Sequence, residues 1–410
     1  MFTIVDENTK LPIKMWLPDE THLDSLCIEQ SYHLANLPFL YKWVSLMPDA
    51  HAGMGMPIGG VIASCDVIIP NAVGVDIGCG MAFAGTDIKV DEIRNIPTGN
   101  GTLMQAIIGD ILRNIPVGFN RHKTIQSCQT LDAALDSREK YEVNPKLYEQ
   151  IAAGYFQVGT LGGGNHFIEL QEDDESCLGI MIHSGSRNFG KQICDYFHNL
   201  ARCLNKKWHV KVPEEWRLSY LPVDSEEGKQ YINWMNLALD FASENRDKMM
   251  FSVRGILEKW LEKYAKINFE YTNEINCHHN YAALEHHYNK DVWIHRKGAT
   301  RARAGELAVI PGAMGSYSYI VEGLGNEMSF CSSSHGAGRK YSRKGAMANF
   351  STEEVMVDLQ EQGVILGKHN KKDVAEESRF AYKDINEVME NQKDLVTPVK
   401  RLKTIGVVKG

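Results

Sequence analysis

What the sequence lacks disfavours several classes of protein. The 410 residues contain no run of eighteen apolar residues, and the first ten, MFTIVDENTK, lack the basic and then apolar pattern of a secretory leader. The nine cysteines include no Cys-x-x-Cys pair, which argues against a disulfide framework and a zinc ribbon. We therefore expect a cytoplasmic protein without a membrane partner.

Positive charge is also in short supply. The chain has 44 Lys and Arg residues against 52 Asp and Glu residues, a net charge of −8, which argues against non-specific coating of nucleic acid. One window, residues 296–345, reverses this balance, with eight basic and three acidic residues. A solvated charged face would explain the excess, but its mixing with glycine-rich motifs favours an anion-handling surface. The basic residues are Arg296, Lys297, Arg301, Arg303, Arg339, Lys340, Arg343 and Lys344.

The pattern of apolar residues indicates a mixed α/β chain. Helical periodicity occupies 190–207 and 227–265, and Ser351 with Glu354 forms a capping box that opens a helix at 352–362. A further amphipathic helix is expected at 372–393. Short strand-like runs end at glycine clusters. Because no linker or repeat divides the chain, we expect a single domain over 1–410, with a polar surface insertion at about 115–150.

Four short motifs, three of them rich in glycine, contain residues that could hold metal ions. In Gly74-Val75-Asp76-Ile77-Gly78-Cys79-Gly80 the glycines suggest a turn that brings the Asp76 carboxylate and the Cys79 thiol to one point. The alternative is a buried structural cysteine with Asp76 capping the turn. In Gly162-Gly163-Gly164-Asn165-His166-Phe167-Ile168-Glu169, His166 could be a ligand and Glu169 could accept from a guanine edge. A plain glycine turn is the alternative.

The other two motifs add histidines. His183 ends a strand before Ser184-Gly185-Ser186-Arg187, where Arg187 and the open amides of a helix would face an anion. A histidine satisfied by the backbone would explain His183 equally. In Cys277-His278-His279-Asn280 only one histidine of the adjacent pair can face a site, so one ligand is expected there.

The densest motif is Ser332-Ser333-Ser334-His335-Gly336-Ala337-Gly338-Arg339. A histidine between hydroxyls and glycines is accessible from several sides, as a nucleophile must be. One Asp, one Cys and several His at strand ends are what a two-metal phosphoryl-transfer site would use.

Taken together, these motifs resemble the RtcB family of GTP-dependent RNA ligases. The likeness runs from Pro12-Ile13-Lys14-Met15-Trp16 to Val408-Lys409-Gly410. It includes, in order, PDAHAGMG (48–55), GVDIGCGM, GGNHFIE, HSGSR, INCHHN, RKGA (296–299), GLGNE (323–327) and SHGAGR. The resemblance implies an RtcB-type fold, an α/β (α+β-like) arrangement of antiparallel or mixed sheets with outer helices around a central metal and nucleotide cleft.

The resemblance also implies roles for residues. Two Mn²⁺ ions would be held by Asp76, Cys79, His166, His183 and His279, with Cys79 bridging both ions, and His335 would be the nucleophile that GTP guanylylates. Contacts to the nucleotide would fall on Asn165, His166, Phe167, Ile168, Glu169, His279, Asn280, Pro311, Gly312, Ala313, Met314, Ser318, His335, Gly336, Ala337, Gly338 and Lys409. Arg187 and Arg339 would contact RNA phosphates. Ala313 departs from the family's usual Pro-Gly-Ser-Met run.

The implied reaction joins an RNA 3′-phosphate or 2′,3′-cyclic phosphate end to a 5′-hydroxyl end through an RNA-(3′)pp(5′)G intermediate, in RNA repair or tRNA splicing. Partners would be GTP, RNA ends and, where one is needed, an accessory activator protein. Two alternatives keep part of this chemistry: a metal-dependent phosphodiesterase, and a non-catalytic RNA-binding paralogue. An intact histidine nucleophile and guanine acceptor argue against the first, and a complete ligand set argues against the second.

Overall fold

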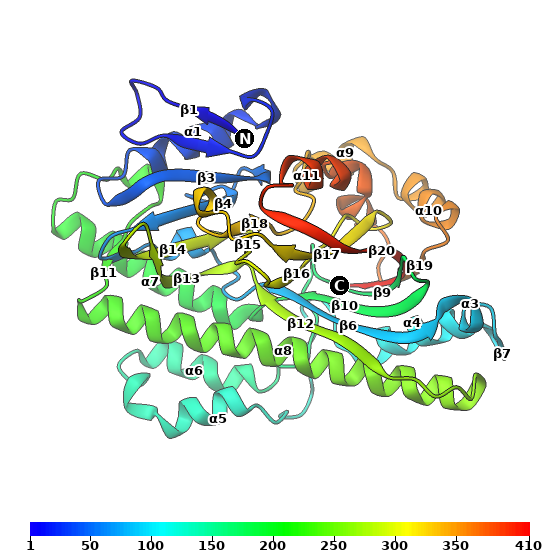
Figure 1. The fold of residues 1–410 in the computed structure, drawn as a ribbon. Helices are drawn as coiled ribbons and strands as arrows, with labels where there is room; N and C mark the ends of the chain where they lie inside the picture. The colour runs from blue at the N-terminus through cyan, green and yellow to red at the C-terminus, as the bar shows by residue number, and fades with distance from the viewer.

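Two large β-sheets form the centre of the molecule, and helices pack outside them (Figure 1). The computed structural model describes all residues from Met1 to Gly410. All strand pairs are antiparallel except β2 with β3 and β19 with β20. The expectation of an α/β fold with antiparallel and mixed sheets and outer helices is confirmed. No helix combines the length and the apolar character needed to cross a bilayer.

The first sheet has six strands and carries the N-terminus. Its order is β1 (Phe2–Ile4), β2 (Ile13–Met15), β3 (Leu40–His51), β4 (Ile58–Ser64), β14 (Lys290–Lys297) and β13 (Asn280–His287).

The second sheet has eight strands. Its order is β12 (Tyr271–His278), β6 (Gly80–Lys89), β10 (Cys177–Ser184), β9 (Phe167–Asp173), β20 (Val396–Lys409), β17 (Tyr317–Gly323) and β16 (Leu307–Ile310), with β19 (Ile365–Gly367) beside β20. The two end strands, β12 and β16, approach each other, so the sheet curls toward a barrel. Since β12 ends at His278 and β13 begins at Asn280, His279 is the residue that joins the two sheets.

Three short ladders and eleven α-helices complete the fold. The ladders are β5 (Val67–Ile68) with β11 (Leu221–Pro222), β7 (Pro97–Thr98) with β8 (Gly101–Thr102), and β15 (Ala299–Arg301) with β18 (Ser332–Ser334). The helices are α1 (Ser25–Ala35), α2 (Pro70–Val73), α3 (Val90–Ile93), α4 (Leu103–Asn114), α5 (Gln129–Asp136), α6 (Pro145–Gly154), α7 (Arg187–Lys207), α8 (Glu226–Tyr264), α9 (Arg343–Asn349), α10 (Thr352–Glu361) and α11 (Ile385–Asn391).

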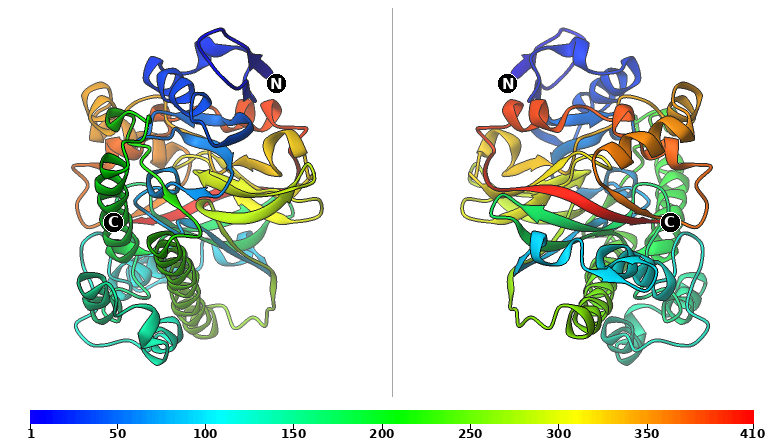
Figure 2. Two further views of the ribbon diagram at one scale, coloured as in Figure 1. Left: turned by 90° about the vertical axis from the view of Figure 1, so that its left-hand side faces the viewer. Right: turned by 90° about the vertical axis from the view of Figure 1, so that its right-hand side faces the viewer.

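The long helix α8 supports the second sheet from one side, where it lies below the strands in both views of Figure 2. Met249, Val253 and Leu257 recur at four-residue steps and are fully buried, because this spacing keeps them on one helix face. They join α4 and the undersides of β9, β10 and β20 in the largest apolar cluster. This layer fixes the strands whose ends carry the glycine-rich motifs of the sequence.

Three of the four expected helices are present, as α7, α8 and α10, and α10 begins with the expected capping box. The prediction of a continuous helix at 372–393 is wrong. That segment forms two short 3₁₀ turns, Val374–Glu377 and Arg379–Ala381, before α11. Backbone bridges from Ser378 to Met314 and from Tyr382 to Arg339 interrupt the helical pattern.

The segment 115–150 contains the helices α5 and the start of α6. Leu131, Leu147 and Ile151 are buried and pack in the apolar cluster formed with α7 and α8. This part of the chain is therefore attached to the helical layer through its apolar side chains.

Candidate active site

The turn between α2 and β6 brings Asp76 and Cys79 together, as the three glycines of the motif predict. The Cys79 N–H donates to the Asp76 carbonyl at 3.0 Å, which closes the turn. Space for the carboxylate depends on Gly185 of the HSGSR motif, because a Cβ at that position would collide with the Asp76 carboxylate. The two motifs thus fit each other around one acidic side chain.

All five predicted metal ligands converge at this point. His166 Nε2 lies 3.0 Å from Asp76 Oδ2 and 3.2 Å from Cys79 Sγ. His183 Nε2 lies 3.4 Å from Cys79 Sγ and 3.3 Å from His279 Nε2. His166 precedes β9, His183 lies on β10, and His279 lies between the two sheets, so the cluster forms where four strand ends meet.

The chemistry of this cluster suits divalent cations. Burial lowers the pKa of His183 and of His279 well below the usual value, so both imidazoles are neutral and can donate a lone pair. Burial also raises the pKa of the Cys79 thiol well above its usual value. Thiolate, imidazole and carboxylate together form a donor set that transition-metal ions prefer. The residues present therefore fit a metal centre.

Arg246 of α8 holds the ligand-bearing loops from behind. Its fully buried guanidinium donates to the carbonyls of Gly78 at 2.9 Å and Ser184 at 2.8 Å, and lies 3.1 Å from His278 Nδ1. His278 therefore faces the helix while its neighbour His279 faces the cluster. This confirms that only one histidine of the pair points into the site.

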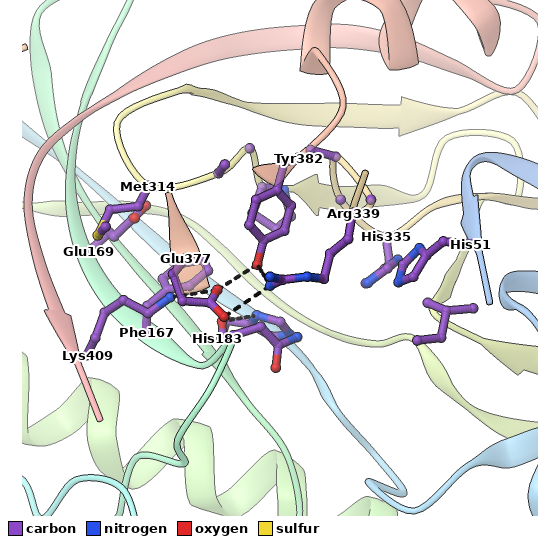
Figure 3. Close-up of a pocket in the computed structure, with 18 of the residues that line it drawn as sticks. His51, Phe167, Glu169, His183, Met314, His335, Arg339, Glu377, Tyr382 and Lys409 are labelled. Atoms are coloured by element: carbon purple, nitrogen blue, oxygen red, sulfur yellow. Dashed lines mark hydrogen bonds and ion pairs between the residues drawn. The ribbon is translucent and has the colours of Figure 1, made fainter. Parts of the chain in front are cut away.

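A pocket opens beside the cluster and contains most of the predicted nucleotide contacts (Figure 3). The predicted residues that line it are Asn165, Phe167, Glu169, Pro311, Gly312, Ala313, Met314, His335, Gly336, Ala337, Gly338 and Lys409. Burial raises the pKa of Glu169 to about 8, against the opposing effect of Lys409. The carboxyl group that was predicted to meet guanine is thus held inside the pocket wall.

Five predicted nucleotide contacts do not line the pocket. His166 and His279 belong to the metal cluster, and Ile168 points into the apolar cluster behind the sheet. Ser318 accepts from the Gly312 N–H at 3.0 Å and shapes the 311–314 turn. Asn280 donates to the Asp76 carbonyl at 3.1 Å and accepts from the Gly298 N–H at 2.7 Å, so its side chain supports the site.

His335 lies in the pocket wall with one ring nitrogen anchored. Its Nδ1 is 2.6 Å from Oδ2 of the fully buried Asp49, and the same oxygen accepts from the backbone N–H groups of His335 and Gly336 at 3.1 and 3.3 Å. With the Nδ1 proton donated to Asp49, Nε2 carries the free lone pair. Asp49 lies in the motif PDAHAGMG, but no role was predicted for it from the sequence.

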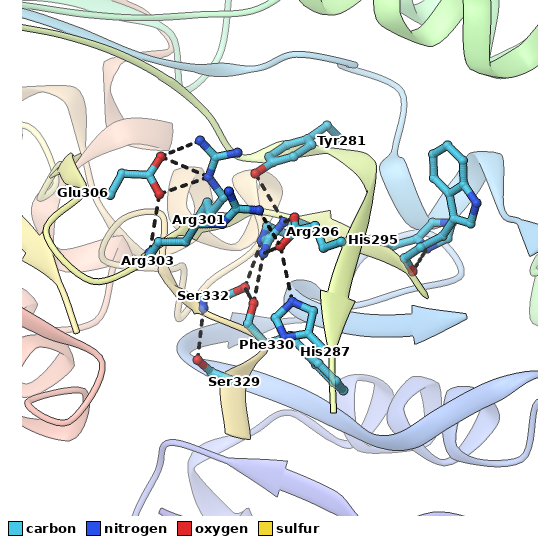
Figure 4. Close-up of polar contacts among 12 residues, drawn as sticks. Tyr281, His287, His295, Arg296, Arg301, Arg303, Glu306, Ser329, Phe330 and Ser332 are labelled. Atoms are coloured by element: carbon cyan, nitrogen blue, oxygen red, sulfur yellow. Dashed lines mark hydrogen bonds and ion pairs between the residues drawn. The ribbon is translucent and has the colours of Figure 1, made fainter. Parts of the chain in front are cut away.

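The strand before His335 is held by a buried ion pair (Figure 4). Arg296 and Glu285 are in contact, and both are almost completely buried. The Arg296 guanidinium also donates to Ser332 Oγ and to the Phe330 carbonyl, each at 2.9 Å. Because Ser332 begins β18 and β18 leads into His335, this network fixes the position of the predicted nucleophile.

The far side of the pocket contains a second network that the sequence did not predict. Glu377 accepts from Lys409 Nζ at 3.1 Å, from Arg339 at 3.2 Å and from the Tyr382 hydroxyl at 2.6 Å (Figure 3). Although burial raises it, Lys409 and Arg339 hold the pKa of Glu377 below its usual value. Glu377 and Tyr382 lie in the segment that was expected to be a plain helix, which is why they were missed.

Of the eight basic residues expected to form an anion-handling surface over 296–345, four are held inside the fold, whereas Arg303, Lys340, Arg343 and Lys344 are exposed. Arg296 is paired with Glu285, Arg301 with Glu306 and Arg339 with Glu377, and the buried Lys297 donates to two backbone carbonyls. These cations therefore stabilise the fold around the pocket. Arg343 remains exposed and lines the pocket entrance, with the nearest carboxylate, Glu376, at 3.9 Å.

Arg187 begins α7 beside the metal cluster. Its guanidinium donates to Thr160 Oγ1 at 3.0 Å and to the Gly118 carbonyl at 2.5 Å. It is half-buried, and burial lowers its pKa. As predicted, Arg187 lies where a strand, β10, ends and the N-terminus of a helix, α7, begins.

Comparisons with known proteins identify the family of the chain. Residues 30–410 match the family model described as tRNA-splicing ligase RtcB. The chain is 37% identical to the RNA-splicing ligase RtcB of Escherichia coli K12 over 97% of both chains. It is 31% identical to the tRNA-splicing ligase RtcB of Thermococcus kodakarensis, over 99% of this chain and 96% of that one. The chain therefore belongs to the RtcB family.

Proposed function

We propose that this protein is a GTP- and Mn²⁺-dependent RNA ligase that joins 3′-phosphate or 2′,3′-cyclic phosphate ends to 5′-hydroxyl ends, in tRNA splicing or RNA repair. The single observation that carries the proposal is the position of His335. Its pocket-facing imidazole is anchored by Asp49, and its ring centroid is 4.8 Å from that of His279 of the predicted metal cluster. A nucleophile, a nucleotide pocket and a metal site thus share one wall.

Asp76, Cys79, His166, His183 and His279 would hold two Mn²⁺ ions. Bound there, the ions would offset negative charge on the phosphates of GTP and of the RNA end. The manganese assignment rests on family membership, since by affinity order a Cys/His/Asp site holds Zn²⁺ more tightly.

His335 would act as the nucleophile in three steps that start from an RNA 3′-phosphate. A 2′,3′-cyclic phosphate would first be opened by water, with the P–O2′ bond breaking and O2′ taking a proton. Nε2 attacks the α-phosphorus of GTP, forming an N–P bond as pyrophosphate leaves. An oxygen of the RNA 3′-phosphate then takes the GMP group, the N–P bond breaks, and RNA-(3′)pp(5′)G is formed. Finally the 5′-hydroxyl attacks the 3′-phosphate and GMP leaves. Asp49 serves throughout by holding the Nδ1 proton and the ring orientation.

Guanine preference would come from the other end of the pocket. Glu169 can accept the two N–H groups of the guanine edge, which adenine does not present in the same pattern. Lys409 has three donors, of which Glu377 takes one, so the ammonium can also donate to the guanine O6. Phe167 and Met314 supply apolar surface for the base.

We also propose that residues 1–410 act as one cytoplasmic catalytic domain, with the segment 115–150 as a surface insertion. The pocket supports the single domain, because its lining extends from His51 near the start of the sequence to Lys409 near its end.

The decisive experiment is transfer of label from [α-³²P]GTP to the protein in the presence of Mn²⁺. Wild type and His286→Ala should retain label after denaturation, whereas His335→Ala should retain none. His286 is a matched control because it is an exposed histidine that contacts only Asp291. In a parallel assay, 3′-phosphate and 5′-hydroxyl RNA ends should be joined and 3′-hydroxyl and 5′-phosphate ends should not.

Absence of label across a series of divalent metals would refute the guanylylated-histidine mechanism. Removal of RNA end phosphates without any requirement for GTP would instead favour a phosphodiesterase.

A further inference from the structure

Phe119 is the most exposed large apolar side chain of the molecule. Its ring is fully exposed, at 108% of the reference value, although single exposed apolar residues are ordinary in proteins. Its position is what distinguishes it. Phe119 follows directly on Gly118, whose carbonyl accepts from Arg187 beside the metal cluster.

The backbone around Phe119 is attached to the active site. A Cβ placed on Gly410 would collide with the Gly118 backbone, and a Cβ placed on Gly162 would collide with His166, so these backbones approach one another closely. Glycine backbones therefore lie between the loop that carries Phe119 and the predicted metal ligand His166. Because glycine has no side chain, the loop and the site lie close together.

The loop is also held in place on its other side. The N–H groups of His122 and Gln126 donate to the carbonyls of Phe156 and Tyr155, each at 2.9 Å, and Val117 is buried in the large apolar cluster. A side chain on an anchored loop is presented to solvent in a defined place. It is not the tip of an untethered segment.

Two basic residues without a carboxylate partner lie close to Phe119 in the sequence. Residues 115–127 contain Arg121 and Lys123 and no acidic residue. Both side chains are exposed, and neither takes part in an ion pair in the molecule. An aromatic face next to unpaired cations is the combination that binds single-stranded nucleic acid, because bases stack on the ring and phosphates meet the cations.

We infer that the loop 118–123 binds an unpaired nucleotide next to an RNA terminus, with its base stacked on Phe119 and its phosphate facing Arg121 and Lys123. The inference rests on the proposed RNA substrate. It adds a binding contact for the RNA strand just outside the predicted metal site. Contacts of this kind fix the register of an end without reading its sequence.

The test uses the full chain and two short single-stranded RNAs, one with 2-aminopurine at the 3′-phosphate terminal nucleotide and one with it at the 5′-hydroxyl terminal nucleotide. Stacking quenches 2-aminopurine fluorescence, so the arm that is quenched on binding identifies the end that Phe119 holds. Phe119→Ala should lose this quenching and weaken binding about tenfold to a hundredfold. Phe119→Tyr should retain both.

Phe251→Ala is the matched control, since Phe251 is 80% exposed on α8 and belongs to no pocket described above. It should behave as wild type. The double variant Arg121→Ala, Lys123→Ala should weaken both arms equally and make the dependence of log K on log salt shallower by about 1.4, for two phosphate contacts.

Quenching and affinity that survive in Phe119→Ala, or a wild type that quenches neither RNA, would overturn the inference. GTP labelling of His335, measured in the same preparations, separates this result from the proposed function. Loss of quenching in an enzyme that takes no label would leave the RNA contact standing and remove the ligase mechanism. Normal GTP labelling together with unchanged RNA affinity in Phe119→Ala would keep the ligase mechanism and remove the RNA contact. Phe119 would then be available to contact a protein.

Discussion

A single carboxylate oxygen determines how His335 can react. Oδ2 of Asp49 accepts three N–H groups, from the His335 ring, from the His335 backbone and from the Gly336 backbone. A carboxylate oxygen suits this position because it only accepts and carries negative charge, whereas an amide oxygen in the same place would accept without that charge. Ring tautomer and ring orientation are therefore set together.

Asp49→Asn should lower the rate of GTP labelling by about 100-fold or more, because the imidazole is no longer held with its Nε2 lone pair toward the pocket. The rate is measured as single-turnover transfer of label at saturating GTP. Asp291→Asn, which alters only the exposed pair with His286, should leave the rate unchanged. A labelling rate for Asp49→Asn within a few fold of wild type would show that Asp49 has only a structural role.

The site residues that the sequence could predict are those whose chemistry is local to a motif. Asp76, Cys79 and His183 each stand beside glycines that reveal a turn or a strand end. Glu377 and Tyr382 carry no such pattern, and their place in the pocket depends on tertiary bridges to Met314 and Arg339. The charge excess at 296–345 is partly offset in a way that the window does not show, since Glu285 and Glu377, which pair with Arg296 and Arg339, lie outside it.

At the scale of elements, α8 is both a structural support and part of the site. One end of the helix packs under the second sheet through Met249, Val253 and Leu257. One turn earlier, Arg246 reaches through to the loops that bear Cys79 and His279. Displacement of this helix would therefore be transmitted directly to the predicted metal ligands.

Arg246→Met should reduce the free energy of unfolding by about 3 kcal/mol, because two buried carbonyls and the Asn276 side-chain oxygen lose their donor. Urea unfolding measures the loss, and elemental analysis of the folded fraction should show less bound metal. Arg254→Met changes an arginine of the same helix that pairs at the surface with Glu274, and it should cost about 1 kcal/mol or less. Full metal content in folded Arg246→Met would contradict a positioning role.

A helix could be predicted from the sequence where its apolar residues recur at the helical period and all lie on the face that is buried. α7, α8 and α10 each bury one continuous face, so their apolar spacing is visible in the sequence. In 372–393 the apolar residues belong to two different clusters, with Val374 in one and Val388 in the other. Backbone bridges at Ser378 and Tyr382 interrupt the chain between them, and periodicity alone does not reveal that division.

At the scale of the whole molecule, the predicted metal site lies where the two sheets join. His279 is the connecting residue, and the other ligands come from the second sheet and its flanking turn. Metal binding at this site should therefore stabilise the whole molecule against unfolding, and not one segment alone.

Removal of metal by a chelator should lower the midpoint of thermal unfolding by on the order of 5 °C while keeping one transition. The stabilisation by Mn²⁺ should grow as pH rises, because burial raises the pKa of the Cys79 thiol and its proton must leave before metal binds. Scanning calorimetry at several pH values measures both effects. Cys79→Ser serves as the control and should respond little to chelator. An unchanged midpoint after verified metal removal would contradict this linkage.

The position of β20 has a consequence for biosynthesis. This strand lies between β9 and β17, yet it is made of residues 396–409, long after its two neighbours. Until it is synthesised, both neighbours present open edges that can pair with other chains. The same strand brings Lys409 into the pocket. A nascent chain therefore completes its sheet and its nucleotide pocket in one late event, and before that event it is both inactive and open to misassembly.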